Sequence, residues 1–134
     1  MRGFNVIWVF SPNGDKVLMC KRQKEPYKGL YNIVGGKIED GEDGLAAAYR
    51  ELQEETNITN IELIHVMDST YFSDEPYRLE IYVGKLNEEV SVYGDEKELV
   101  WIDITENFFD MTCFAGHGLL GHVFEVIKKR KLDK

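Results

Sequence analysis

The sequence predicts an α+β domain, in the broad α/β class, in which a mixed β-sheet is packed between helices. Short apolar segments with strand character precede and follow an alanine-rich helical segment within residues 36–58. A second segment, residues 119–131, has apolar residues at helical spacing and closes the chain. Strands on both sides of one helix, followed by another helix, favour a sheet with helices on its faces.

Composition limits the class of protein. The 134 residues predict one domain spanning 1–134, with 43% hydrophobic and 30% charged residues, as is ordinary for a globular protein. The net charge of -8 argues against a nucleic-acid polymer as partner, although a small nucleotide remains compatible when metal ions meet its charge. No apolar run reaches membrane-spanning length and no secretory signal is evident, so we expect no membrane contact and a cytoplasmic location. The two distant cysteines, without CxxC spacing, are expected to be thiols.

The N-terminal segments read as a β-hairpin. Residues 5–10 (NVIWVF) form a predicted buried strand, residues 11–15 a turn, and residues 16–21 the return strand. Lys21, Arg22 and Lys24 then form a small basic cluster. This cluster is either a solvated loop or a phosphate contact, with Arg22 as the candidate residue.

A short strand, residues 31–34, runs into Gly35, Gly36 and Lys37. Paired glycines let a backbone approach a ligand closely. Asn32 carries both a donor and an acceptor, which can read a purine edge or satisfy nearby backbone groups.

Strands are predicted again after the helical segment. Residues 61–72 and 77–86 have strand character and are joined by a turn at 73–76, with Glu80 expected to face solvent. An acidic loop, 87–98, leads to a last short strand at 99–102 and a short helix at 106–111.

Acidic residues gather at the end of the 36–58 segment. Glu51, Glu54 and Glu55 have i, i+3 and i+4 spacing, which places them on one side of a helix, at the end where the dipole disfavours negative charge. Converging carboxylates without basic partners repel one another, and a hard divalent cation such as Mg²⁺, or Mn²⁺, would relieve the repulsion. Arg50 can reach acids one turn away, and Glu42 is a possible partner for it.

The spacing in this segment reads G-x5-E-x7-R-E-U-x-E-E-x-G-U, where U is a bulky apolar residue. This pattern resembles the Nudix box of the Nudix hydrolases. Eight of its nine specified positions are filled: Gly36, Glu42, Arg50, Glu51, Leu52, Glu54, Glu55 and Ile58. Asn57 stands where the pattern has glycine, and because asparagine tolerates a left-handed backbone, a helix C-cap remains feasible there.

The resemblance implies the Nudix α/β/α sandwich over the whole chain. It implies metal and general-base roles for Glu51, Glu54 and Glu55, an orienting role for Arg50, and a metal contact from the Gly35 carbonyl. In the MutT-type branch, the asparagine that matches Asn32 contacts the base. A carboxylate of the acidic loop often joins the metal cluster in this family, and the candidates are Asp95, Glu96 and Glu98.

The resemblance also places a base-stacking wall near residues 108–117, with Phe114 as the candidate and core packing as the alternative. The other expected substrate contacts are Asn32, Gly36, Lys37 and Arg22. The short segment after 111 lacks the paired aspartates of the best-known enzyme that removes oxidised purine nucleotides.

Together with the resemblance, these residues predict Mg²⁺-dependent hydrolysis of a nucleoside diphosphate linked to a group X. A nucleoside triphosphate, including an oxidised one such as 8-oxo-dGTP, would give monophosphate and pyrophosphate. The alternatives are hydrolysis of ADP-ribose, a nucleotide sugar or a dinucleoside polyphosphate, or a non-catalytic nucleotide-binding module. A monomer and a homodimer are both compatible with the sequence.

Overall fold

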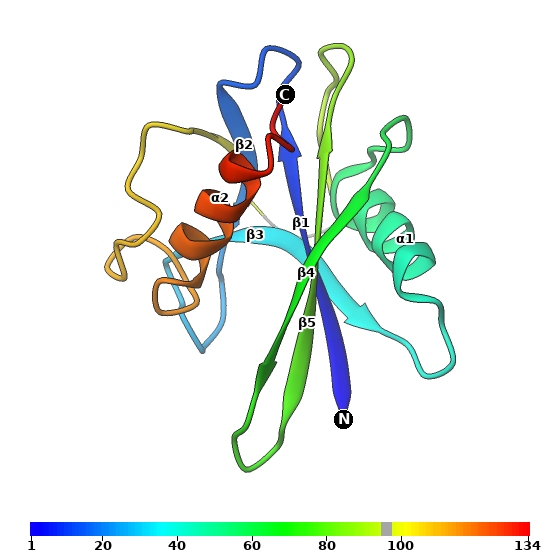
Figure 1. Cartoon of the computed structure of the whole chain (residues 1–134), viewed down its shortest axis with the longest axis vertical. Helices are drawn as coiled ribbons and strands as arrows, with labels where there is room; N and C mark the ends of the chain where they lie inside the picture. Colours follow the sequence, from blue (N-terminus) through cyan, green and yellow to red (C-terminus); the bar gives the residue numbers. More distant parts are fainter. Residues whose placement is uncertain (95–97) are drawn as a thin grey trace.

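Six strands and two helices form the part of the chain that the computed structural model describes, residues 1–94 and 98–134. The helices lie on opposite faces of one mixed sheet (Figure 1), which confirms the predicted arrangement. In chain order the elements are β1 (Arg2–Phe10), β2 (Lys16–Lys21), β3 (Tyr31–Ile38), α1 (Gly44–Thr56), β4 (Ile64–Tyr71), β5 (Tyr77–Lys85), β6 (Glu98–Asp103) and α2 (Leu119–Lys129).

The strand order is β4-β5-β1-β3-β2-β6. Strand β1 pairs in parallel with β5 along its whole length and antiparallel with β3. The predicted β1–β2 hairpin is therefore correct only at the turn, where Phe10 pairs with Val17. Beyond that pair the two strands separate and β3 lies between them, because β1 is buried on both faces and takes hydrogen-bonding neighbours along both edges.

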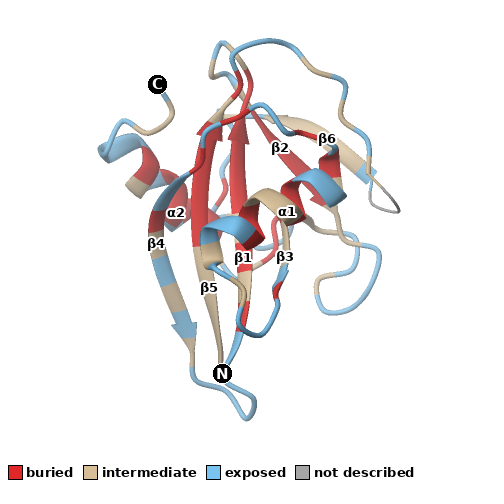
Figure 2. Ribbon diagram, turned by 90° about the vertical axis from the view of Figure 1, so that its right-hand side faces the viewer, coloured by how far each residue is buried: buried red, intermediate tan, exposed pale blue. Residues whose placement is uncertain are grey.

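Alternate residues of β1 contribute to two different cores. Trp8 and Phe10 pack toward α2, whereas Ile7 and Val9 pack toward α1. All four side chains are fully buried, and the middle of the sheet is the most buried part of the molecule (Figure 2). The sheet thus separates two environments, one beneath each helix.

Three local predictions need correction. Strand β3 continues through both glycines to Ile38, since its residues 35–38 pair with β1. Residues 106–111 form turns and no helix, because the side chains of Asn107 and Asp110 accept hydrogen bonds from the amides two residues ahead.

Glu80 does not face solvent, since only 13% of its side chain is exposed. It accepts hydrogen bonds from Tyr82 (2.7 Å) and Arg78 (3.1 Å), which compensate its burial. Its carboxylate lies where a Cβ on Gly44, the first residue of α1, would stand. A negative charge at this end of a helix is favourable.

Both ends of α1 have defined caps. The Asp43 side chain accepts from the amide of Ala46 at 3.1 Å. Asn57 has φ 66°, and its amide donates to the Gln53 carbonyl at 2.8 Å, which confirms the predicted left-handed C-cap.

Cys20 and Cys113 form no disulfide. Neither helix of the described residues has the length and apolarity needed to cross a membrane.

Candidate active site

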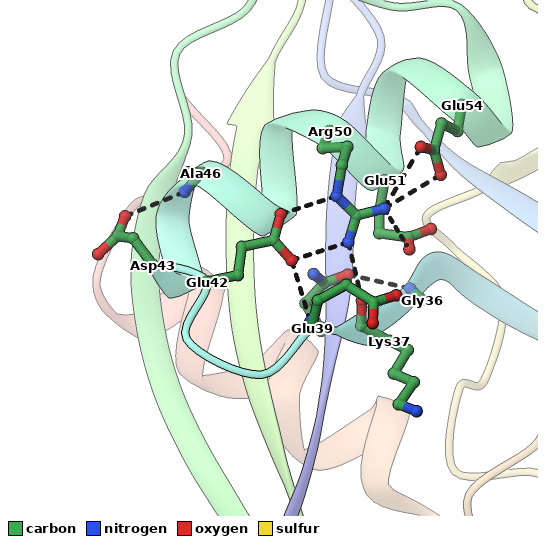
Figure 3. A network of polar contacts seen from close by, with 10 residues as sticks. Gly36, Lys37, Glu39, Glu42, Asp43, Ala46, Arg50, Glu51 and Glu54 are labelled. Atoms are coloured by element: carbon green, nitrogen blue, oxygen red, sulfur yellow. Dashed lines mark hydrogen bonds and ion pairs between the residues drawn. The ribbon is translucent and has the colours of Figure 1, made fainter.

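The acidic side of α1 is organised around one guanidinium group. Arg50 Nη1 donates to Glu51 Oε1 at 3.0 Å and approaches Glu54 Oε2 at 3.2 Å (Figure 3). The expectation that Arg50 can reach acids one turn away is confirmed, since helical spacing brings it to the same side as Glu54, and the cluster is therefore not without a basic partner. The guanidinium offsets the repulsion between the two carboxylates.

A bidentate ion pair holds Arg50 in place. Its Nε and Nη2 donate to the two carboxylate oxygens of Glu42 at 2.7 and 2.9 Å, and Nη2 also donates to the Lys37 carbonyl at 3.0 Å. Glu42 accepts a further bond from the amide of Glu39. These contacts, with Arg50 the largest cause, lower the pKa of Glu42 from 4.5 to about 2. The predicted Glu42–Arg50 pairing is confirmed.

Glu51 lies against bare backbone. It is 8% exposed, and its carboxylate stands where a Cβ on Gly36 would be, so only glycine leaves room for it. Burial raises the pKa of Glu51, although the hydrogen bond from Arg50 opposes the rise. One helix therefore presents a covered carboxylate with a raised pKa and, one turn on, the largely exposed carboxylate of Glu54.

The donor set fits a divalent cation. Glu51, Glu54 and Glu55 lie within one turn of α1, and carboxylate oxygens are the ligands that hard cations prefer. Among the described residues, no three carboxylate, imidazole or thiol side chains are already gathered around a common point. Arg50 instead bridges Glu51 and Glu54, while Glu42 and the Lys37 carbonyl hold it independently. If a cation were held by Glu51 and Glu54, the contacts of Arg50 with Glu42 and Lys37 would still fix the guanidinium.

The remaining metal candidates lie in different places. Gly35 is in β3, beside Gly36 and packed against the Asn5 backbone. Glu98 is exposed at the start of β6, where it pairs with Lys21 in the sheet register. Asp95 and Glu96 lie outside the described residues.

A cavity of about 410 Å³ lies on the other face of the sheet, beneath α2. Its apolar wall includes Trp8, Ile33, Leu119, Leu120 and Val123. Gly35 and Gly36 also line it, so the glycine backbone that contacts Glu51 borders the cavity as well. This stretch of β3 connects the acidic side of α1 with a space of the size that small-molecule ligands occupy.

Several predicted substrate contacts reach this cavity. Arg22, Asn32 and Gly36 line it. The Asn32 side-chain oxygen accepts a hydrogen bond from the backbone amide of Ile33 at 2.8 Å. Lys37 is exposed on β3 next to Gly36 and does not line the cavity.

Phe114 occupies a different position from the predicted one. It is 5% exposed, lies outside the cavity lining, and packs edge-on against Phe108 with ring centroids 5.1 Å apart. The core-packing alternative describes it correctly. Its backbone pairs with Tyr31, which draws the residue under the sheet.

Sequence reasoning missed the aromatic residues of the cavity, Phe4, Tyr27, Tyr71 and Tyr77, together with Arg2. They come from β1, a loop and the β4–β5 hairpin, and only the sheet order brings these segments together. Aromatic residues near loops and strand ends were the available signal, which is too common to single them out.

Comparison with known proteins agrees with this architecture. The NUDIX domain model matches residues 1–116. An RNA pyrophosphohydrolase of Pelagibacter ubique is 35% identical over 56% of this chain and 48% of its own length, and an ADP-ribose pyrophosphatase of Bacillus subtilis is 33% identical over 63% and 45%. The chain thus spans about half the length of the curated relatives it matches.

A solved structure extends the fold comparison to the whole chain. The binary complex of a C. elegans Ap4A hydrolase has a TM-score of 0.79, with 19% identity and complete coverage of both chains. At this identity the likeness concerns the fold alone. A mixed sheet between two helices, with a Glu- and Arg-bearing helix beside a glycine-containing strand, defines the class of Nudix-type α/β/α sandwiches. With the family model matching most of its length, the chain belongs to the Nudix hydrolase family.

Proposed function

We propose that this protein hydrolyses a nucleoside diphosphate linked to a group X, using Mg²⁺, with Mn²⁺ as a substitute. One observation carries the proposal: the glycine stretch Gly35–Gly36 touches Glu51 on one face of the sheet and lines the cavity on the other. A nucleotide whose nucleoside part fills the cavity would pass its phosphates along this stretch toward the acids of α1.

The roles of the acidic residues follow from their exposure. Glu54, with 56% of its side chain exposed, is the accessible carboxylate for the metal and for taking a proton from water. Glu51 and Glu55, with the Gly35 carbonyl, are the other proposed metal ligands, and Arg50 orients Glu51 and Glu54. The bound metal would neutralise phosphate charge and lower the pKa of a water molecule. Arg22 and Lys37 would add positive charge in a protein of net charge -8.

The proposed substrate is a nucleoside triphosphate, including an oxidised one such as 8-oxo-dGTP, which would give monophosphate and pyrophosphate. The lining position of Asn32 supports base reading at the cavity. ADP-ribose is the second candidate, because a relative is named an ADP-ribose pyrophosphatase. Dinucleoside polyphosphates, nucleotide sugars and a non-catalytic binding role complete the alternatives.

Two predictions about partners, the absence of RNA binding and the oligomeric state, each need a direct measurement. One relative is named an RNA pyrophosphohydrolase, so the prediction that no nucleic-acid polymer binds needs a direct measurement with a 5′-triphosphorylated RNA oligonucleotide. Size-exclusion chromatography with light scattering distinguishes a monomer from a homodimer. A cytoplasmic location remains a prediction.

The test of function is release of phosphate or pyrophosphate with Mg²⁺ across 8-oxo-dGTP, the ordinary dNTPs, ADP-ribose, Ap4A and the RNA oligonucleotide. Wild type is compared with Glu54→Gln, Asn32→Ala and the control Glu62→Gln, an exposed acid between α1 and β4. We expect Glu54→Gln to lower kcat at least about 100-fold and Glu62→Gln to leave it unchanged. Loss of base preference in Asn32→Ala would support base reading.

The outcomes separate the alternatives. Turnover of ADP-ribose or Ap4A alone would overturn the triphosphate proposal and keep the chemistry of the acids. Binding of nucleotides without any turnover would identify a non-catalytic module. Full activity of Glu54→Gln would contradict the role given to the acidic side of α1.

A further inference from the structure

Two loops contact each other beside the cavity, through Tyr27 and His117. The hydroxyl of Tyr27, in the loop 22–30, lies 3.0 Å from Nδ1 of His117, 90 residues further along the chain. The two rings meet edge to face, with centroids 5.1 Å apart. Tyr27 lines the cavity and is half-buried, whereas His117 is exposed and is not among the lining residues.

Both loops are fixed by their own backbone bonds. The loop 22–30 is closed by the bonds Arg22 N–H to Leu30 O and Gly29 N–H to Arg22 O, each 2.8 Å. The segment bearing His117 is held to β3 because the Tyr31 amide donates to Cys113 and the Ala115 amide donates to Tyr31, each at 2.9 Å. Each of the two loops is thus tied by backbone hydrogen bonds close to the residue that makes the contact.

The backbone at both residues is in the left-handed region. Tyr27 has φ 68° and His117 has φ 54°. Within the described residues, the other non-glycine positions of this kind are Asn57, which caps α1, and Lys131, which follows α2. The two left-handed residues without a helix-ending role contact each other. Such conformations persist where the surroundings enforce them, and they concentrate at ligand sites.

An aromatic wall forms another part of the cavity lining. Tyr71 and Tyr77 stack with centroids 4.9 Å apart and planes at 17°, and Phe4 meets Tyr77 edge-on at 5.9 Å. The pKa of Tyr27 is raised, chiefly by burial and to a smaller extent by Tyr77, while Arg22 opposes the rise. The cavity thus has flat aromatic surfaces contributed by separate segments.

We propose that Tyr27 is a specificity-determining residue that stacks on the planar base of the nucleotide, and that His117 is the positioning residue that holds Tyr27 over the cavity. The inference rests on the proposed function, since it concerns the same substrate. An aromatic side chain can stack on any heteroaromatic ring, so this contact strengthens the binding of every nucleotide base and not of a ligand without a base. Tyr27 therefore selects for the presence of a base, while Asn32 and Arg22 are left to distinguish one base from another.

The test measures ligand binding without metal and without turnover. Isothermal titration calorimetry gives the Kd of AMP, GMP, CMP and UMP, and of ribose 5-phosphate, which lacks the base. Wild type is compared with Tyr27→Leu, Tyr27→Phe and His117→Ala. The control is Phe72→Leu, an aromatic residue 86% exposed between β4 and β5.

We expect Tyr27→Leu to raise the Kd of all four monophosphates about 5- to 100-fold and to leave that of ribose 5-phosphate unchanged. Tyr27→Phe keeps the ring and loses the bond to His117, so its effect is smaller and matches that of His117→Ala. Because His117 acts through Tyr27, the effect of His117→Ala should disappear in the Tyr27→Leu background. In turnover assays Tyr27→Leu should raise KM and leave kcat unchanged.

Three results would overturn the inference: unchanged monophosphate binding in Tyr27→Leu, equal weakening of ribose 5-phosphate, or a full effect of His117→Ala without the Tyr27 ring. Circular dichroism of each variant excludes loss of fold as the cause. Base-dependent binding lost in Tyr27→Leu, together with no turnover by wild type, would refute the proposed hydrolysis and keep the stacking role. Turnover by wild type that is unchanged in Tyr27→Leu would support the proposed hydrolysis and refute the stacking role of Tyr27.

Discussion

The two faces of the sheet differ in how closely the chain packs on them. Beneath α1, backbone and carboxylate are in contact, since Gly36 leaves room for Glu51 and Gly44 for Glu80. Beneath α2, the side chains of β1, β3 and the helix leave a cavity of about 410 Å³. Under the proposed function, the face beneath α1 holds the reacting carboxylates by close packing, and the face beneath α2 provides the volume in which the ligand would bind.

The two faces also differ in how far apart in the sequence their contributing residues lie. The acidic side of α1 is built almost entirely within residues 36–55, and its key ion pair joins Glu42 to Arg50 across eight positions. The cavity draws on residues from Arg2 to Val123. Local spacing suffices for the first arrangement, whereas the second exists only after the whole sheet has formed. Four predictions examine this contrast, in order of decreasing effect.

The largest effect is expected for Gly36→Ala. The new methyl group would overlap the Glu51 carboxylate and displace it, and small misplacement of a reacting group costs about 100-fold in rate. We expect kcat to fall by about that factor, measured on the best substrate of the panel.

Gly41→Ala is the matched control for this substitution. Gly41 has φ 78° and open space around its Cβ position, so alanine there costs about 1 kcal/mol of stability without touching an acid. Equal loss of kcat in both variants would show that a general loss of stability, and not the position of Glu51, explains the result.

Filling the cavity should affect binding alone. Leu119→Trp, at the start of α2, adds bulk to the cavity wall on the face away from Glu51. We expect KM to rise about 10-fold with unchanged kcat, the amount that an extra or missing methylene or two in a pocket typically costs. Leu119→Met, which nearly conserves volume, should behave as wild type. A fall in kcat without a change in KM would mean that the two faces are not separate in function.

The Glu42–Arg50 pair gives a prediction about pH. Because the folded pKa of Glu42, about 2, is below its ordinary value of 4.5, the unfolded chain binds more protons between these values. The stabilisation is fully present above pH 4.5 and is lost as pH falls toward 2. In urea titrations, Glu42→Gln should make the free energy of unfolding less dependent on pH in this window. An identical pH dependence in wild type and variant would exclude the pair as its source.

The smallest effect is expected at Asn57. Glycine at this position would match the Nudix pattern and adopt φ 66° without cost, but it would lose the 2.8 Å bond from the Asn57 side chain to the Tyr93 hydroxyl. We expect Asn57→Gly to change the free energy of unfolding by a few tenths of a kcal/mol. Asn57→Ala, which makes the left-handed conformation unfavourable, should cost about 1 kcal/mol. Equal costs would show that the side-chain bond, and not the backbone conformation, matters at this cap.

Prediction from sequence succeeded where neighbouring residues decide the outcome. The helix with its C-cap at Asn57, the Glu42–Arg50 pair and the shared side of Glu51 and Glu54 follow from spacing and helix geometry. It was less successful at residues 106–111, where Asn107 and Asp110 bond the backbone and replace the expected helix by turns. Local hydrogen bonds compete there with helix formation, and apolar content does not reveal them.

The sequence by itself determined which residues carry charge, where the helices and most strands run, and that acids gather at the end of α1. Only the tertiary structure decided that β3 separates β1 from β2, that Phe114 lies in the core, and that Tyr27 meets His117. The physical reason is the range of the interactions. Helix spacing and caps involve residues a few positions apart, whereas sheet order and cavity lining depend on how distant segments share the burial of apolar surface.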